Sequence, residues 1–323
     1  MSTYVLEPDF NTIAEQAFDI IQSAGDGETL TADMQLRAKN VYNFMMSHWQ
    51  TQGMHLWTYT EGRMYLTKAQ RSYDTSQATT TAANYARVTN APIDDSLGAA
   101  ALAAASTVTV ADGTKFTNGD TIGILQDDAT IHWTTINGAP AANVITLTVN
   151  LVSAAASGNW VTAYNDTYAP ISRIPENGMR RYSGTNNNEV PVLFQDRPTY
   201  YSLSDKATAS GTPVNIYFSR QQTAIGQGHK FEVYQAPSSE QYAVNFTYER
   251  MIQLVDTPAT DKIDAPRYWH EAIIWGMADR LKFRFGVKEN STRGQEIKMY
   301  ADQYLTDALN YDSSVADVYV KVR

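Results

Sequence analysis

The five histidines are the first residues to consider for metal chemistry. They are scattered along the chain, at His48, His55, His132, His229 and His270. No two of them show the H-x₃-H or H-E-x-x-H spacing that brings two imidazoles onto one metal ion. The chain contains no cysteine, so it has no thiolate nucleophile, no disulfide and no Cys-ligated zinc. We therefore expect no metal site and no cofactor, and interpret His270 as a surface or packing residue.

Carboxylates offer two further chemistries. Asp127 and Asp128, with Asp120 nearby, could bind a cation, but they lack the glycine and the terminal glutamate of a calcium loop. A solvated hairpin turn is the preferred interpretation. Glu15 and Asp19 lie one helical turn apart, and paired carboxylates can hydrolyse glycosidic bonds. Such pairs on a surface helix are usually only solvated, so a cell-wall hydrolase is a minor alternative.

Glycine-rich and basic segments give no phosphate site. Gly226-x-Gly228 lacks a third glycine, a Lys-Ser/Thr pair and the strand–helix context. The small polar loops 184–188 and 221–228 are expected to be mobile, or ordered only by a neighbour. Local basic residues could touch DNA or an acidic partner, or could be ordinary surface cations; they are Arg180, Arg181, Arg284 and Lys288. No Ser-His-Asp set can be identified, and we expect a protein that is not an enzyme.

The totals limit the class of protein. A length of 323 residues suggests two or three domains, and 43% apolar residues suffice for a core. The formal net charge of −9 argues against a sequence-independent grip on DNA, because phosphate binding needs clustered Lys and Arg. It is compatible with a wall along which DNA slides. The N-terminus lacks the features of a signal peptide, and no apolar run approaches the roughly 20 residues that span a bilayer.

The stretch from 245 to 286 contains the clearest helix. Apolar residues recur every fourth position at Trp269, Ile273, Met277, Leu281 and Phe285, which places one face on a core. Pro266 suits the start of this helix and Gly286 suits its C-cap. We expect this helix to be the centre of a structural subunit.

Three other helices are expected. Residues 8–24 carry the capping box Thr12-x-x-Glu15, and Thr31 can cap a second helix that ends at Gly53. These two would form a helical hairpin. A last helix would open at a second capping box, Thr292-x-x-Gln295.

The segment 97–165 differs in composition from the rest of the chain, with few charges and many Thr, Ala, Val and Asn. Turn signals separate five short runs, which predicts an inserted small all-β barrel or sandwich. The expected strands are Thr107–Val110, Thr121–Leu125, Ile131–Thr135, Val144–Thr148 and Trp160–Tyr164. Aromatic faces stack on sugars, so Trp133 and Trp160 motivate an alternative function, a carbohydrate-binding tail or capsid module.

Residues 166–250 continue as β structure. The expected strands are Val190–Phe194, Tyr200–Leu203, Val214–Phe218, Phe231–Tyr234 and Ala243–Tyr248, with Gln195–Pro198 as a turn. The fold class is therefore α+β. In the tail, 311–323, the run Val318–Val322 resembles a strand. It either pairs with another chain or closes a sheet of its own subunit.

This order of parts resembles the head-to-tail adaptors of short-tailed bacteriophages, also called head-completion, packaged-DNA-stabilising or tail accessory factors. The first matching stretch is the N-terminal helix pair with Trp49-Gln-x-x-Gly53-Met-His-Leu-Trp57. The second joins Asp196-Arg-Pro-x-x-Tyr200 and Pro213-x-x-Ile216-Tyr-Phe218 to Phe231-x-x-Tyr234-x-x-Pro237. The third is Tyr248-x-Arg250 followed by Pro266-Arg-Tyr-Trp269-His-Glu-Ala-Ile-Ile-Trp-Gly-Met-Ala-Asp-Arg280-Leu.

The resemblance implies a core of 1–95 and 166–310, in which the N-terminal helical hairpin and the C-terminal helices pack with an antiparallel β region. The unit 97–165 would be an insertion. It also implies a virion protein at the head–tail junction, assembled in the host cytoplasm as a dodecameric ring. Its partners would be other copies of itself, the portal protein, and a downstream tail nozzle or tail tube protein. Packaged DNA would pass through the channel without sequence-specific binding, and no membrane is involved.

The family often reaches the portal through a C-terminal segment. By position alone, the resemblance makes six tail residues portal contacts: Val315, Val318, Tyr319, Val320, Val322 and Arg323.

Overall fold

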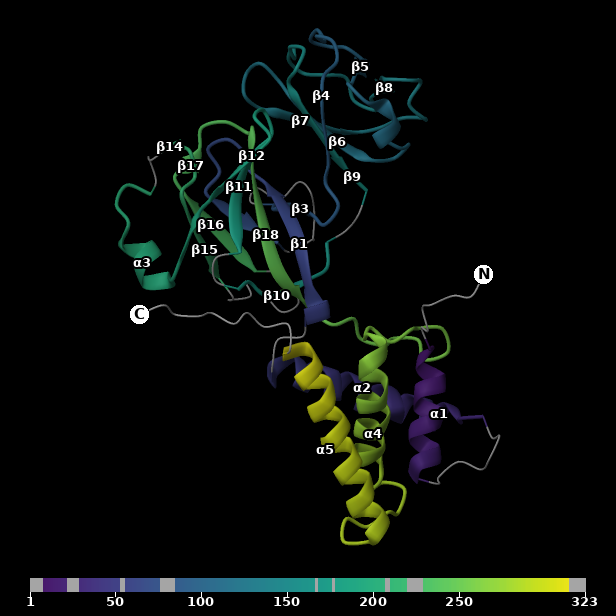
Figure 1. Ribbon diagram of the computed structural model, residues 1–323. Coiled ribbons are helices and arrows are strands. Elements are labelled where there is room, and N and C mark those ends of the chain that lie inside the picture. The colour runs from purple at the N-terminus through teal and green to yellow at the C-terminus, as the bar shows by residue number, and fades with distance from the viewer. Residues whose placement is uncertain are drawn as a thin grey trace. The chain divides into compact units, whose positions relative to one another are not determined.

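The computed structural model describes residues 8–21, 29–52, 56–75, 85–165, 168–175, 178–206, 210–219 and 229–313 (Figure 1). The fold is mixed α+β, with helices and mainly antiparallel sheets. Its contacts divide the chain into two units. The helical unit comprises Met1–Tyr59 and Met251–Arg323, and the β unit comprises Thr60–Arg250.

In the helical unit, α1, α2 and α5 each pack on α4 (Figure 1). The elements are α1 (Phe10–Ile21), α2 (Ala32–Gln52), α4 (His270–Leu281) and α5 (Thr292–Ser313), with the 3₁₀ turns η1 (Leu56–Thr58) and η3 (Arg267–Trp269). Gly276 permits the close approach of α2, since a Cβ there would lie 2.9 Å from Met45 Sδ and 3.0 Å from the Trp49 ring. Of the described helices, none is long and apolar enough to cross a membrane.

The predicted apolar stripe of the central helix is confirmed. Trp269, Ile273, Met277 and Leu281 are all buried in one core. However, α4 ends at Leu281, and Phe285 follows in a turn, where its ring packs edge-on against Phe18 at 5.1 Å. The helix is therefore shorter than the periodicity predicts.

The expected caps are partly wrong. Thr31 does cap α2, because its hydroxyl accepts the Met34 N–H at 3.3 Å. Thr12 does not cap α1: the Asp9 carboxylate accepts the Thr12 N–H at 2.8 Å, so Thr12 lies in the first turn. Likewise, the Ser291 hydroxyl, and not that of Thr292, accepts from α5, at Gly294 N–H (3.1 Å). In both cases a capping side chain stands just ahead of the expected one.

Two sheets of the β unit share one core, which contains Phe231 and Phe246. The six-stranded sheet has the order β12 (Asn188–Pro191), β11 (Met179–Ser183), β18 (Tyr242–Arg250), β1 (Tyr59–Tyr65) and β3 (Arg87–Thr89), and β10 (Ile171–Arg173) also pairs with β18. The four-stranded sheet has the order β13 (Leu193–Gln195), β15 (Asn215–Ser219), β16 (Lys230–Tyr234) and β2 (Ser72–Asp74). A small parallel pair joins β14 (Ser210–Gly211) to β17 (Ala236–Pro237).

The insertion forms a second pair of sheets around its own core, which includes Val108, Ile122 and Val161. One sheet has the order β4 (Ile93–Ser96), β9 (Trp160–Tyr164), β6 (Thr121–Leu125) and β7 (Ile131–Thr135), and the other pairs β5 (Thr107–Thr109) with β8 (Val144–Thr146). The short turn η2 (Gly113–Lys115) follows β5. All five predicted strands are therefore present, and β4 is an additional one. Among the described strands, no sheet closes into a barrel. The independence of 97–165 as a domain stays a prediction.

One predicted strand is wrong. Tyr200–Leu203 lies mostly in the short helix α3 (Arg197–Ser202), whose N-cap is Asp196, bonded to Thr199 N–H at 3.0 Å. Proline in the first helical turn fixes the backbone angle that a helix needs, and this outweighs the β preference of two tyrosines. Val190–Phe194 is split between β12 and β13, whereas the last three strands of this region are confirmed as β15, β16 and β18.

Candidate functional site

The predicted portal contacts cannot be placed. Val315, Val318, Tyr319, Val320, Val322 and Arg323 lie outside the described residues, as does the loop 221–228 with Gly226 and Gly228. Helix α5 runs to Ser313, so the first residues of the predicted tail are helical. Within them, Asp312 is buried and accepts from the Tyr268 hydroxyl at 2.6 Å and from Trp269 Nε1 at 3.2 Å. The partner role of the tail stays a prediction.

The carboxylates considered as cation ligands accept hydrogen bonds in turns of the insertion. Asp120 accepts from the Thr117 N–H at 2.7 Å, and Asp127 accepts from the Ala156 N–H at 2.9 Å. Asp128 accepts from the Thr130 hydroxyl, which lowers the pKa of this carboxyl. No group of three or more metal-ligating side chains occurs in the part of the chain that the structure describes. Glu15 and Asp19 are both exposed on α1.

The histidines do not converge. His132 Nε2 lies 3.1 Å from the Val149 carbonyl oxygen, and His270 Nε2 lies 3.4 Å from that of Ala265. Burial lowers the pKa of His270, which favours the neutral ring. His48 contacts Gln52, His229 packs on Phe218, and His55 is outside the described residues.

The basic candidates have different surroundings. Arg180 pairs with Glu61 at 3.3 Å and with Glu189 at 3.1 Å, and Arg181 donates to the Pro213 carbonyl at 3.0 Å. Both arginines are therefore engaged within the β unit. Arg284 and Lys288 are exposed in the turn that follows α4.

The two tryptophans that motivated sugar binding lie in a joint between the insertion and the six-stranded sheet. Trp160 is only 2% exposed, and its Nε1 donates to Asp94 at 3.0 Å. Trp133 packs edge-on against Tyr65 at 4.9 Å, with the Arg87 guanidinium 4.3 Å from its ring. Trp160 therefore presents no open face on which a sugar could stack.

An ion pair between Arg63 and Asp94 lies in this contact region between the insertion and the sheet. We call the region the Arg63–Asp94 joint. Arg63 Nη1 donates to both oxygens of Asp94, at 2.6 and 2.7 Å, while its Nε donates to Asn245 at 2.7 Å. The guanidinium also lies 4.0 Å from the centre of the Tyr182 ring. No local sequence pattern indicates these contacts, because Arg63, Asp94 and Asn245 are far apart in the chain. They fix the insertion on the sheet.

Gly184 belongs to the same joint. A Cβ at this position would come within 1.8 Å of the Trp160 ring, so only glycine fits against the indole. The Tyr182 hydroxyl donates to Asn187 at 2.7 Å across this turn. The loop 184–188 is therefore held by side chains of its own β unit, which the sequence did not indicate.

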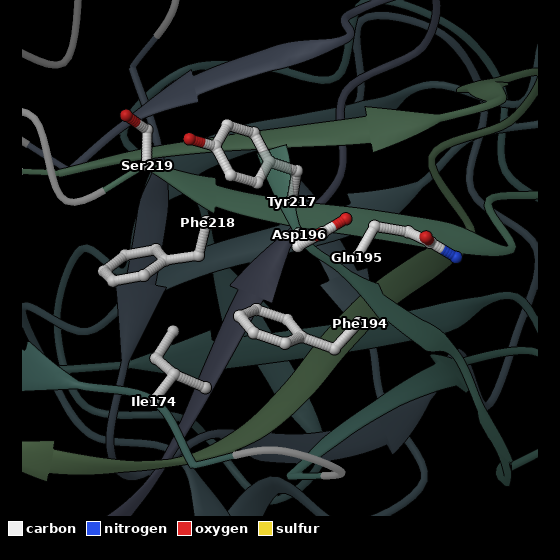
Figure 2. A pocket seen from close by; sticks show the side chains of 7 residues that line it. All are labelled: Ile174, Phe194, Gln195, Asp196, Tyr217, Phe218 and Ser219. Carbon is white, nitrogen blue, oxygen red and sulfur yellow. The ribbon is translucent and has the colours of Figure 1, made fainter. Parts of the chain in front are cut away.

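A recess of about 330 Å³ marks the edge of the four-stranded sheet (Figure 2). We call it the notch. Strand β13 pairs with β15 from Leu193 opposite Asn215 to Gln195 opposite Tyr217, and the chain then turns into α3. Because β15 continues to Ser219, a step is left at the edge. Its lining consists of Ile174, Phe194, Gln195, Asp196, Tyr217, Phe218 and Ser219.

The notch combines an apolar end with a carboxylate. Figure 2 shows Ile174, Phe194 and Phe218 gathered at one end and Asp196 with Gln195 at the other. The Thr199 hydroxyl and N–H lower the pKa of Asp196, so its carboxyl is ionised at neutral pH. Such a recess fits a partner side chain with an apolar stem and a cationic end, and an adjacent sheet edge can accept an extended segment.

A larger recess of about 560 Å³ lies in the helical unit between α1, α4 and α5. We call it the helical groove. Trp275 of α4 and Tyr300 of α5 form an aromatic wall, with ring centres 4.9 Å apart. Arg293 is held in place because its Nε and Nη2 donate to the Ile20 carbonyl at 3.1 and 2.6 Å. Ile20, Ile297, Thr292 and Glu296 complete the lining. The groove can bind an apolar side chain.

No protein-family model matches the sequence, and no curated protein matches it.

Proposed function

We propose that the chain is a structural virion protein, the ring-forming head-to-tail adaptor of a short-tailed bacteriophage. It docks beneath the portal, extends the DNA channel, helps to retain packaged DNA and provides the platform for the tail. The proposed arrangement packs an N-terminal helical hairpin and the C-terminal helices with the antiparallel β region, and carries 97–165 as an embellishment.

The observation that carries this proposal is the apolar surface of the helical unit. Phe44 and Leu36 of α2 are 73% and 54% exposed. Other large apolar side chains are exposed around α4 and α5; they are Tyr268, Phe283, Met299, Tyr300, Leu309 and Tyr311. Single exposed apolar residues are ordinary, but a set of this size on one small unit is typical of an association surface.

A ring of identical subunits requires two complementary side surfaces on each subunit. The notch and the helical groove are concave, whereas the exposed side chains of Phe44 and Leu36 project from α2. Features of both kinds on one chain support head-to-tail association. The formal net charge of −9 supports a channel role, because many phosphate contacts would hold DNA that must later leave.

Electron microscopy of the purified chain mixed with the portal protein of the same virus tests the proposal. We expect a closed ring of the chain on one end of the portal, with portal-matched symmetry. A chain that stays monomeric when saturating portal is present would overturn the adaptor function. Turnover of peptidoglycan by the purified chain, abolished by Glu15→Gln, would instead support the hydrolase alternative.

A further inference from the structure

We propose that Phe44 of one copy inserts into the helical groove of the next copy and thereby forms the subunit interface. This inference rests on the ring-forming function proposed above and names the residues that close the ring. Its occupant is a second copy of this chain. The argument uses three properties of the helical unit: the exposed ridge on α2, the groove, and their positions around α4.

The convex partner is one ridge of α2. Leu36, Asn40, Phe44 and Ser47 are all exposed and follow one another at spacings of three or four residues, so they share a face. None of these side chains is charged. The neighbouring charges of α2 are satisfied within the chain, since Arg37 pairs with Asp33 and Lys39 pairs with Asp256. The ridge can therefore enter an apolar site without burying a charge.

The concave partner is the helical groove. Its volume of about 560 Å³ exceeds the need of one aromatic side chain and falls in the range of binding pockets, roughly 300–1,000 Å³. Trp275 and Tyr300 offer ring faces and edges, and aromatic pairs favour edge-to-face contact over plain apolar burial. The Arg293 guanidinium donates to the Ile20 carbonyl and is held there. A partner side chain can therefore enter the groove without displacing Arg293.

The ridge and the groove lie on different faces of one unit. α4 meets α2 through Gly276, and the Trp269 ring of η3 packs at a tilt against the Trp49 ring of α2, with 5.7 Å between ring centres. Trp275 instead shares an outer strip of α4 with Glu271 and Asp279, four residues to either side. In Figure 1, α2 crosses behind α4. A knob and a hole on different faces produce a heterologous contact, which repeats around a ring and does not stop at a dimer.

Disulfide trapping tests this contact without background, because the chain has no cysteine. The chain carrying both Asn40→Cys on the ridge and Glu296→Cys in the groove, which keeps Phe44 and Tyr300, is assembled with the portal and then mildly oxidised. We expect a ladder of disulfide-linked multimers for the double variant. Each single variant should give nothing larger than a dimer. A second variant, Phe44→Asp, tests the same contact. It should lower the yield of rings roughly tenfold or more, because a central interface residue contributes strongly to binding. It should leave the melting temperature of the monomer unchanged.

Gln16→Asp is the control, since Gln16 is also exposed on a helix of the helical unit and lies outside the ridge, the groove and the exposed apolar set. It should assemble normally. If the wild-type chain forms rings while Phe44→Asp assembles normally and the double-cysteine variant stays monomeric, the interface is wrong and the adaptor function stands. If the wild-type chain forms no ring on the portal, both proposals fail together.

Discussion

The helical unit and the β unit hold their parts together by different means. Around α4, the core is apolar, and the rings of Trp49, Trp57 and Trp269 meet at its start, while the buried Lys282 donates to Asp279 at 2.5 Å and to the Gly294 carbonyl at 3.1 Å. In the β unit, the insertion is attached through the Arg63–Asp94 joint and through Glu240, whose carboxylate accepts from the Ile131 N–H at 2.5 Å and the Lys68 N–H at 3.0 Å. Directional bonds therefore add to ring packing where the insertion meets the sheet, whereas apolar burial dominates around α4.

This difference extends to the surfaces. The helical unit leaves Phe44 and Leu36 in solvent, where they can bury more apolar area on association. The insertion shows an unusual surface of another kind, since no Asp, Glu, Lys or Arg occurs between 129 and 165. The insertion also exposes Leu102 and Val152, at 79% and 73%, so the helical unit is preferred for assembly because its exposed side chains include several aromatic rings.

The largest expected effect tests apolar burial in the helical unit. Trp269 is 0% exposed, so Trp269→Ala should lower the free energy of unfolding by about 3–5 kcal/mol through the lost contacts and the cavity. Denaturant unfolding followed by circular dichroism measures this. Phe44→Ala is the matched control, and it should change the monomer by less than about 0.5 kcal/mol because its ring is exposed. Equal costs for the two variants would show that α2 does not face solvent as described.

The next effect tests the directional contacts of the β unit. Asp94→Ala leaves the buried guanidinium of Arg63 without its carboxylate, and breaking such a pair costs about 3 kcal/mol. Adding Arg63→Met should restore part of this loss, because the uncompensated charge is then removed. Calorimetry of the three chains measures both effects.

Lys115→Ala is the control for Asp94→Ala. Lys115 pairs with the neighbouring Asp95 at 3.3 Å, but the lysine side chain is 41% exposed, so a change of at most about 1 kcal/mol is expected. If Arg63→Met deepened the loss caused by Asp94→Ala, the joint would owe its stability to packing of the arginine and not to charge pairing.

Local patterns in the sequence predicted many elements correctly. The fourfold spacing from Trp269 to Leu281 identified the central helix, because burial on one face requires that period. The five strands of the insertion were also found, since turn residues separate short runs of β-branched and aromatic residues. These features depend only on near neighbours in the chain.

Features that depend on distant residues could not be predicted. Arg63, Asp94 and Asn245 meet only after the insertion folds onto the sheet, and the burial of Trp160 depends on Gly184, which is remote in sequence. The notch depends on where β13 ends relative to β15. Likewise, the helical groove needs Ile20 beside Tyr300. Patterns among neighbouring residues do not encode these contacts between distant parts of the chain.

The end of the helical unit offers a smaller effect, which separates stability from assembly. Removing 311–323 deletes Asp312, the acceptor for Trp269 Nε1 and the Tyr268 hydroxyl, and should cost about 1–3 kcal/mol. Removing only 314–323 keeps this carboxylate and should leave the melting temperature unchanged, while portal binding weakens. Calorimetry and a portal pull-down measure the two properties. Equal melting temperatures for the two truncations would show that Asp312 does not stabilise the unit.

The smallest expected effect concerns the carboxylate of Asp9, which caps the start of α1. The Thr12 hydroxyl and N–H donate to Asp9 and lower the pKa of its carboxyl below the ordinary value of 3.8. The pKa is lower in the folded state, so the cap contributes its full stability above about pH 4 and loses it as the pH falls through the folded value. Asp9→Ala should therefore cost about 1 kcal/mol at neutral pH.

Asp9→Asn separates the cap from its charge, because the amide oxygen can still accept from Thr12. At neutral pH this variant should stay within a few tenths of a kcal/mol of the parent chain, and its stability should fall less steeply below pH 4. Asp19→Asn is the matched control on the same helix, and it should not lower stability, because an acid near a helix C-terminus is unfavourable. If Asp9→Asn lost as much stability at pH 7 as Asp9→Ala, the start of α1 would depend on a charge and not on a hydrogen bond. The helical unit would then resemble the β unit more closely than its apolar core indicates.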